Sequence, residues 1–400
     1  MTYNTLLVLL GVGLLGAGAG LVGSFAVLRR RALLGDALAH AALPGLCLGF
    51  LAFGERNLFA MLVGALATGL LGIGVVTVLR RFTRVREDAA IGIVLSVFFG
   101  VGIVLTRLIQ NSKTLPGSKA GLDSYILGKT AGMIQSDVIL IAGVGALSLG
   151  LIPLLYKEFL LVGFDAAFAR VQGWPVLAID VLLTSLIAVT VVIGLPAVGV
   201  VMMTALLIVP GVTARFWSDR LSLVLAIAVA VGLLMGVIGT AISATYAKMP
   251  AGPVITLVGT AFFVASALFA PRRGFVSRLL TNWRDRREEA YRGFLKFVHG
   301  LPQQSVDRET VRQRGDSSQV RHGLRTGDLI HLSDESVGLS ESGQICARDV
   351  IRNEALWKRF VVHYPDLVSQ AQPFSTKPID ELLEPHIVAD LQARLEEGQS

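Results

Sequence analysis

Residues 34–50, LGDALAHAALPGLCLGF, form an apolar segment that contains one aspartate and one histidine. Asp36 and His40 are four positions apart, so on a helix their side chains share one face about one turn apart. Ionisable side chains are costly in lipid unless they face a polar cavity, and a carboxylate with an imidazole suits Zn, Mn or Fe. Pro44-Gly45 predicts a break in the helix, as in segments that line a pathway. We therefore expect a route for a metal ion through a membrane.

This segment belongs to a long apolar region, residues 1–270, which is rich in Leu, Val, Ala and Gly. Its apolar runs are about 20 residues long, the length that a transmembrane helix needs. Charged residues become frequent after Ala270. We expect an all-α polytopic membrane protein with eight or nine transmembrane helices in residues 1–274. A small cytoplasmic α+β domain, winged-helix-like and helical, would occupy residues 275–400.

Nine apolar spans can be placed in the membrane region. The stretch 194–214 contains Gly and Pro and could instead be re-entrant, which would leave eight crossings. The expected spans are 5–28, 37–54, 58–79, 89–109, 135–156, 175–194, 197–214, 221–245 and 252–270.

Basic residues are distributed unevenly between these spans. If every span crosses, one side receives Arg29–Arg31, Arg80, Arg81, Arg84, Arg86, Lys157, Arg170, Arg215, Arg220, Arg272 and Arg273. The other side receives only Arg56, Lys113, Lys119, Lys129 and Lys248. The positive-inside rule then assigns the arginine-rich side, and with it the tail, to the cytoplasm. The basic residues flank the spans, so they do not indicate nucleic-acid binding.

Four stretches of the membrane region resemble the permease subunits of bacterial ABC importers for manganese, zinc and iron. They are 35–45 (GDALAHAALPG), 87–93 (EDAAIGI), 164–173 (FDAAFARVQG) and 206–210 (LLIVP). The resemblance implies a multi-pass protein of the bacterial inner membrane that works by alternating access. It also implies that Asp36 and His40 contact the transported metal, which agrees with the interpretation from the residues themselves.

The same resemblance implies partners and a coupling segment. The partners would be separate ATPase subunits, an extracytoplasmic metal-binding protein and a second permease chain, identical or related. The cytoplasmic loop 157–174 would form a short coupling helix that docks on the ATPase, with Phe164, Asp165, Ala169 and Gly173 as its key positions. Asp165 or a neighbour would cap this helix, and the small residues would allow close approach.

The tail has its own pattern. We expect a polar helix near 283–298, a short helical pair within 307–325, a hairpin at 327–339, a helix over 340–363 with Ser340 as N-cap, and a last amphipathic helix over 379–397. Residues 339–343 (LSESG), which open the helix to His363, and residues 381–395 resemble the C-terminal part of metal-dependent repressors of the diphtheria-toxin-repressor type. Glu354 stands where those repressors place a ligand histidine, and Glu384-Pro385 aligns with their Glu-His pair, so that His386 is one position displaced.

Several signals also have a structural interpretation. Asp36 and His40 could simply bond each other and a neighbouring helix, and Glu87 with Asp88 could complement a helix dipole. Residues 128–130 (GKT) imitate a phosphate-binding loop, but Asp123 occupies the position of its required glycine, so we expect no ATP binding. In the tail the basic residues are not concentrated enough to predict nucleic-acid binding.

We therefore predict the pore-forming permease subunit of an ATP-driven importer of Mn, Zn or Fe. It would be a transport subunit and not an enzyme, with no permanently bound cofactor and the metal as its cargo. Two alternatives remain open. The chain could be a membrane-tethered metal sensor whose tail is the output domain, or a permease for a metal chelate with a wider pore.

Overall fold

The computed structural model describes residues 3–29, 31–53, 58–111, 128, 130–246, 249–271, 273–314, 316–333, 335–368 and 378–397. The chain divides into two compact units, Met1–Ser277 and Arg278–Ser400. The five basic residues expected on the arginine-poor side lie outside the described residues, and so does Asp123.

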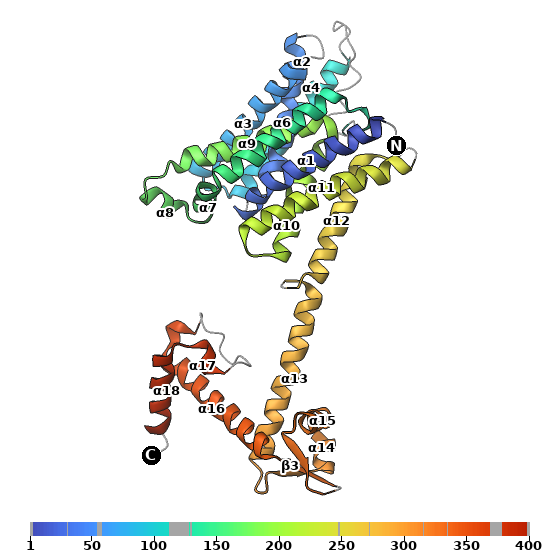
Figure 1. Ribbon diagram of the computed structural model, residues 1–400. Helices are drawn as coiled ribbons and strands as arrows, with labels where there is room; N and C mark the ends of the chain where they lie inside the picture. Colours follow the sequence, from blue (N-terminus) through green and yellow to red (C-terminus); the bar gives the residue numbers. More distant parts are fainter. Residues whose placement is uncertain are drawn as a thin grey trace. The chain divides into compact units, whose positions relative to one another are not determined.

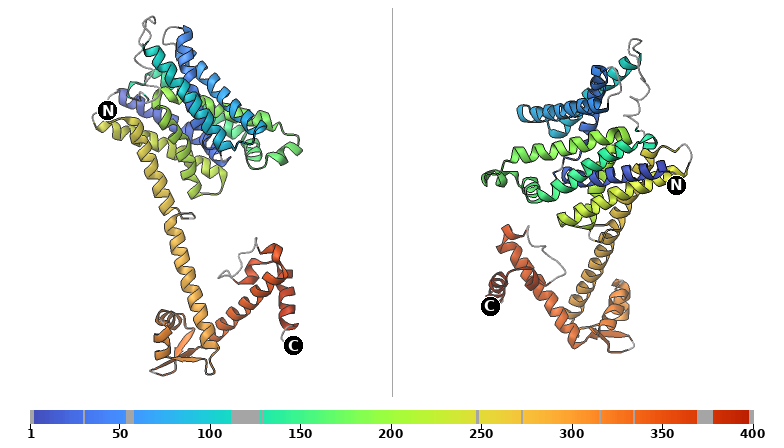
Figure 2. Two further views of the ribbon diagram at one scale, coloured as in Figure 1. Left: turned by 180° about the vertical axis from the view of Figure 1, so that it is seen from behind. Right: turned by 45° about the horizontal axis from the view of Figure 1, so that its top comes forward.

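Among the described residues of the first unit, eight helices are long and apolar enough to cross a membrane (Figure 1). They are α1 (Tyr3–Leu28), α2 (Leu34–Phe53), α3 (Leu58–Phe82), α4 (Glu87–Asn111), α6 (Gln135–Leu154), α9 (Val176–Val198), α11 (Leu221–Thr245) and α12 (Ala251–Phe269). The expected fold class, an all-α membrane protein with eight or nine spans, is confirmed. In Figure 2, α2, α3 and α4 form one group, and α1 packs against α6, α10 and α11.

Small residues allow α1 and α11 to cross closely. A Cβ on Gly16 would collide with the Gly232 carbonyl, and one on Gly20 would lie 2.6 Å from the carbonyl oxygen of Ala228. Such small-residue contacts are the usual way in which membrane helices pack without a hydrophobic driving force. Since residue numbers rise along α1 as they fall along α11, the two helices are antiparallel. The start of α11 therefore lies at the same end of the bundle as the end of α1.

The ninth apolar helix, α10 (Val200–Trp217), follows α9 after Gly199, whose φ of +82° breaks the helical path. α9 begins at the end of the bundle where α1 ends, because Asp180 pairs with Arg29 there. α10 leads from the far end of α9 to the start of α11, so it runs back through the bundle. This course favours nine crossings over a re-entrant loop, and 18 residues make about 27 Å of helix.

α2 continues through Pro44, so the break predicted at Pro44-Gly45 is wrong. Proline has no N–H, so it cannot donate the helical hydrogen bond to the carbonyl group of His40. The helix is nevertheless continuous here, and its neighbours pack tightly against it. A Cβ on Gly45 would collide with the Gly64 carbonyl of α3, and one on Gly102 of α4 would lie 3.3 Å from the Pro44 Cδ.

The second unit begins within the long helix α13 (Phe275–His299) and contains a small antiparallel sheet of order β1-β3-β2. Its other elements are β1 (Ser305–Asp307), α14 (Arg308–Arg314), α15 (Ser317–Thr326), β2 (Leu329–His331), β3 (Ser336–Leu339), α16 (Glu341–His363), α17 (Ile379–Leu382) and α18 (Pro385–Glu397). One core joins α13 to the sheet through Phe294, Leu295, Val306 and Val337. Figure 1 shows α14 and α15 beside the sheet.

Most of the expected tail elements are present. The helical pair, the hairpin and the helix after Ser340 are confirmed, and the Ser340 hydroxyl accepts a hydrogen bond from the Gly343 N–H at 3.0 Å as an N-cap does. The single helix expected over 379–397 is wrong, because α17 ends at Leu382 and α18 starts at Pro385. A proline disfavours helical conformation in the residue before it and fits the first position of a new helix.

Candidate metal pathway and coupling segment

Asp36 and His40 lie on the first two turns of α2, on one face as the spacing predicted. The His40 Nε2 lies 3.4 Å from the Asp36 Oδ1, and the two side chains are 16% and 30% exposed, respectively. The His40 ring makes a T-shaped contact with the Phe99 ring of α4, with the ring centroids 4.9 Å apart. The His40 Nδ1 is buried and has no hydrogen-bond partner among the described residues. One nitrogen therefore faces a carboxylate, and the other is left unsatisfied.

Three of the four family-like stretches meet around the start of α2. Leu34 and Ala37 share a buried apolar cluster with Ala90 and Ile91 of α4. From the other side Leu207 of α10 approaches so closely that a Cβ on Gly35 would collide with its side chain. Residues flanking Asp36 are thus fixed by two other helices. Such rigid surroundings are what a site with defined geometry requires.

A single chain supplies few metal ligands at this place. Among the described residues, no group of three or more His, Cys, Asp and Glu side chains is placed to hold a metal ion. Cys47 follows His40 by seven positions on the same face of α2, but its Sγ lies 3.3 Å from the Thr106 Oγ1 and 3.8 Å from the Gly102 carbonyl oxygen. That thiol is engaged in packing between α2 and α4.

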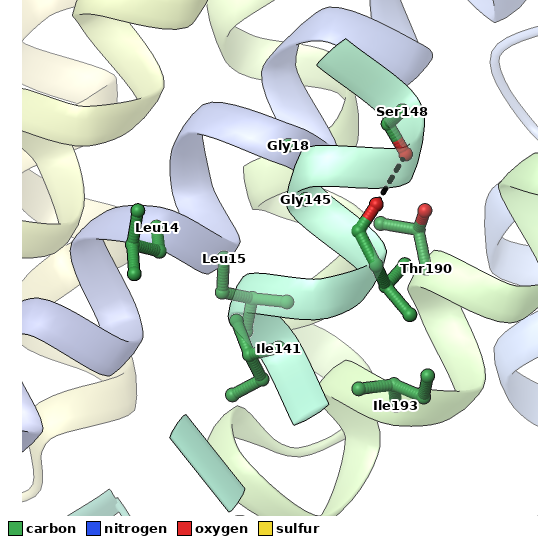
Figure 3. Close-up of a pocket in the computed structure, with 9 residues that line it drawn as sticks. Leu14, Leu15, Gly18, Ile141, Gly145, Ser148, Thr190 and Ile193 are labelled. Atoms are coloured by element: carbon green, nitrogen blue, oxygen red, sulfur yellow. Dashed lines mark hydrogen bonds between the residues drawn. The ribbon is translucent and has the colours of Figure 1, made fainter. Parts of the chain in front are cut away.

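A small pocket between α1, α6 and α9 is not part of this site (Figure 3). Its volume is about 10 Å³, close to the minimum for one water molecule. The Ser148 hydroxyl donates to the Val144 carbonyl at 2.9 Å, and the Thr190 hydroxyl donates to the Leu186 carbonyl at 2.8 Å. Both polar groups that line the pocket are therefore satisfied within their own helices.

The predicted coupling helix is two helices, α7 (Tyr156–Phe164) and α8 (Ala166–Val171), joined at Asp165. The predicted cap is confirmed, because the Asp165 Oδ1 accepts hydrogen bonds from the N–H groups of Ala167 at 3.0 Å and Phe168 at 2.8 Å. α8 then ends in a turn that needs φ of +82° at Gly173, a conformation that favours glycine. The chain divides at Asp165 because the N–H groups of Ala167 and Phe168 donate to the Asp165 side chain. They therefore do not donate to carbonyl groups of α7, as they would in one continuous helix.

The apolar surface of this segment differs from the expectation. Ala169, expected to allow close approach of a partner, is fully buried in the chain's own core. Phe164, Phe168 and Val171 are instead 72%, 50% and 87% exposed. Phe168 and Val171 are three residues apart on α8, the spacing of a shared helix face, whereas Phe164 ends α7, and only Phe164 was singled out from the sequence. We call these three side chains the α7–α8 apolar face.

Charged residues at the same end of the bundle pair more extensively than the sequence suggested. Glu87 was expected to complement the dipole of α4, and it does lie in the first turn of that helix. It also forms an ion pair with Arg31 at 3.2 Å and accepts a hydrogen bond from Arg80 at 2.7 Å, whereas Asp88 is exposed. Asp180 of α9 pairs with Arg29 and Arg31. Sequence reasoning missed Asp180, since nothing local indicates a partner about 150 residues away.

The bundle of apolar helices and the partly exposed ionisable pair on α2 are features of a membrane transport protein. Residues 1–270 match the model of the ABC 3 transport family, so the chain belongs to that family and is the non-catalytic membrane subunit of a bacterial ABC transporter. It is 44% identical over 314 residues to the manganese transport system membrane protein MntC of Bacillus subtilis, a match that covers 78% of this chain and 72% of the relative.

Two further comparisons agree with this family. The zinc transport system membrane protein TroC of Treponema pallidum is 43% identical over 285 residues, which cover 71% of this chain and 94% of the relative. The solved structure of PsaBC from Streptococcus pneumoniae in complex with Fab matches with a TM-score of 0.61 at 30% identity, over 68% of this chain and 94% of that one. The family model ends at residue 270, so it does not support the repressor-like interpretation of the tail.

Proposed function

We propose that this chain forms the pathway for a divalent transition metal ion, Mn, Zn or Fe, and that Asp36 and His40 bind the ion transiently. The supporting observation is His40, whose buried Nδ1 has no partner in the described ranges of the chain while its Nε2 faces a carboxylate. An unpaired buried polar group costs about 1–3 kcal/mol, which argues for a ligand that is bound during function. The names of the two relatives, a manganese and a zinc transport protein, fit a carboxylate–imidazole pair.

Two ligands from one chain suit transport better than storage. A closed set of four protein ligands, as in structural zinc sites, would hold the ion too tightly for passage. Water and a second permease chain, identical or related, would complete the coordination shell. The 30% exposure of the Asp36 side chain leaves its carboxylate open to such partners.

The α7–α8 apolar face is the proposed docking surface for the ATPase. Three large apolar side chains are exposed on this short segment outside the spans, and exposed apolar surface that gathers in one place marks sites of contact with a partner protein. The Asp165 cap holds α8 in shape, so movement of the ATPase would reach the bundle as a rigid displacement. An extracytoplasmic binding protein would deliver the ion to the opposite side.

The tail, residues 275–400, is proposed to be a cytoplasmic winged-helix-like domain that regulates or assembles the transporter. The order helix, strand, two helices, strand, strand and the antiparallel sheet β1-β3-β2 support this assignment. A role in DNA binding is not proposed, because a chain held at the membrane would have to search DNA from there.

Uptake of radioactive Mn and Zn by cells that carry the whole transport system tests this function. We expect Asp36→Ala and His40→Ala to lower uptake by about tenfold or more. Loss of a residue that only supports a metal ligand already lowers metal affinity or activity by about 10–100-fold. Asp88→Ala is the matched control, because Asp88 is an exposed carboxylate at the start of α4. Uptake that survives both α2 substitutions but responds to deletion of 275–400 would favour the sensor. Inhibition of uptake by an added metal chelate, together with normal uptake in the Asp36 and His40 variants, would favour a permease for metal chelates.

A further inference from the structure

Five charged side chains at the end of the bundle where α1 ends form one ion cluster, which we call the Arg31 cluster. Its members are Arg29, Arg31, Arg80, Glu87 and Asp180. The Arg31 Nε lies 3.2 Å from the Glu87 Oε1, and the Arg31 Nη1 lies 3.4 Å from the Asp180 Oδ2. Arg31 thus contacts both carboxylates with different nitrogens of one planar group, an arrangement that guanidinium geometry permits.

The cluster joins elements that are far apart in sequence. Arg29 follows α1, Arg80 is in the last turn of α3, Glu87 is in the first turn of α4, and Asp180 is in the second turn of α9. Arg31 stands three residues before α2. The five side chains therefore fix the relative positions of four helix ends at the entrance to the helix that carries Asp36 and His40.

One side of the cluster contacts the coupling segment. The Arg29 side chain is only 9% exposed, and a Cβ added to Gly163 of α7 would lie 3.8 Å from its Nε. One turn earlier on α1, the Phe25 ring packs against Phe159 of α7, with centroids 5.7 Å apart. Phe159 is fully buried. A displacement of α7 would consequently act on Arg29, and through Asp180 on Arg31.

The other side of the cluster leads to the proposed metal pair. Glu87 begins α4, and Phe99 on the same helix makes the ring contact with His40. The apolar residues next to Glu87, Ala90 and Ile91, pack on the start of α2. A change in the Arg31–Glu87 pair would therefore shift the helix that orients the imidazole.

We propose that Arg31 is a positioning residue for metal transport, which transmits the movement of the α7–α8 segment through Asp180 and Glu87 to the start of α2. This inference rests on the proposed function, because it assumes that α7–α8 receives the ATPase and that α2 contacts the cargo. Physical continuity is supplied by packed side chains and ion pairs, which carry coupling when they have alternative arrangements. Removing one partner of a poorly exposed ion pair leaves a charge uncompensated, so the members of the cluster act together.

The first experiment measures metal transported per ATP hydrolysed by the complete transporter in vesicles. Arg31→Gln and Glu87→Gln should each lower this ratio by about fivefold, and the double variant should be no worse than either, as for residues that act as one unit. ATP hydrolysis itself should persist. Arg84→Gln is the matched control, since Arg84 is an exposed arginine in the same α3–α4 connection, and it should leave the ratio unchanged. Losses that multiply in the double variant, or a normal ratio in Arg31→Gln, would overturn the inference.

The second experiment does not depend on metal passage. Asp36→Cys, made with Cys47→Ala and Cys346→Ala, places one thiol at the start of α2, and its reaction rate with a small thiol reagent is measured with and without ATP in the complete transporter. We expect ATP to change this rate by about fivefold and the added substitution Arg31→Gln to abolish the change while hydrolysis continues, as a broken coupling path predicts. A rate that ignores ATP, or that still responds in Arg31→Gln, would refute the coupling role. The proposed function is tested separately, by metal uptake in the Asp36→Ala and His40→Ala variants.

Discussion

The carboxylates of Asp36 in α2 and of Glu354 in the tail have different charged partners. The Asp36 carboxylate lies 3.4 Å from the His40 imidazole, whose buried Nδ1 is unpaired within the described part of the chain. Glu354 of the tail is held between two ammonium groups, those of Lys296 and Lys358, the second at 3.0 Å. The hydrogen bonds from Lys296 and then Lys358 lower the pKa of the Glu354 carboxyl. A carboxylate neutralised in this way is a poor metal ligand, whereas one beside an imidazole remains available.

The largest expected effect is a change of metal preference in α2. His40→Asp would replace the imidazole by a second carboxylate, and oxygen ligands suit Mn better than Zn. We expect the ratio of Mn to Zn uptake to rise by about tenfold, the effect of 1.4 kcal/mol in relative binding. Competition between the two radioactive metals in one uptake assay measures this ratio. His386→Asp is the control in the tail, where the exposed His386 should leave the ratio unchanged.

A smaller effect is expected when the support of the imidazole is removed. Phe99→Ala abolishes the T-shaped contact with His40, and such aromatic contacts contribute about 0.5–1.5 kcal/mol. The KM for the metal should rise by roughly threefold to tenfold, while the amount of protein in the membrane stays similar. Phe98→Ala removes a ring of the same size that packs on the neighbouring apolar cluster. An equal rise of KM in both variants would show that Phe99 has only a structural role.

Substitution of Cys47, which lies on the same face of α2 as His40, tests whether this residue contributes only to packing or also to transport. Cys47→Ala removes the sulfur that contacts Thr106 and Gly102, and a small core deletion of this kind costs about 1 kcal/mol. Thermal denaturation of the purified transporter should show a modest loss of stability, and uptake by the remaining folded protein should be unchanged. A selective loss of uptake would instead make Cys47 part of the pathway.

The smallest effect is expected in the tail and depends on pH. A lowered carboxyl pKa stabilises the folded state above the ordinary pKa, and this contribution is lost as the pH falls through the lowered value. Glu354→Gln should therefore speed hydrogen exchange in α16 slightly at neutral pH and have no effect below the lowered pKa. Metal uptake should not change. A change in the metal dependence of uptake would revive the sensor interpretation.

Local patterns predicted a large part of this molecule. The four-residue spacing of Asp36 and His40, the lengths of the apolar runs and the Ser340 cap all concern residues within a few turns of one another. Such features follow from helix geometry and hydrophobicity alone. For the same reason the pattern could be misleading at Pro44, where a strong local signal for a break was overruled by close packing of α3 and α4.

The sequence by itself determined that this chain spans a membrane, which residues of α2 share a face, and which family it resembles. Only the tertiary structure decided that Arg31 joins Glu87 and Asp180, that Ala169 is buried while Val171 is exposed, and that a nitrogen of His40 has no partner among the residues that the structure describes. The physical reason is the range of the interactions. Hydrophobic periodicity acts over neighbouring turns, whereas ion pairs and burial depend on helices that meet from distant parts of the chain.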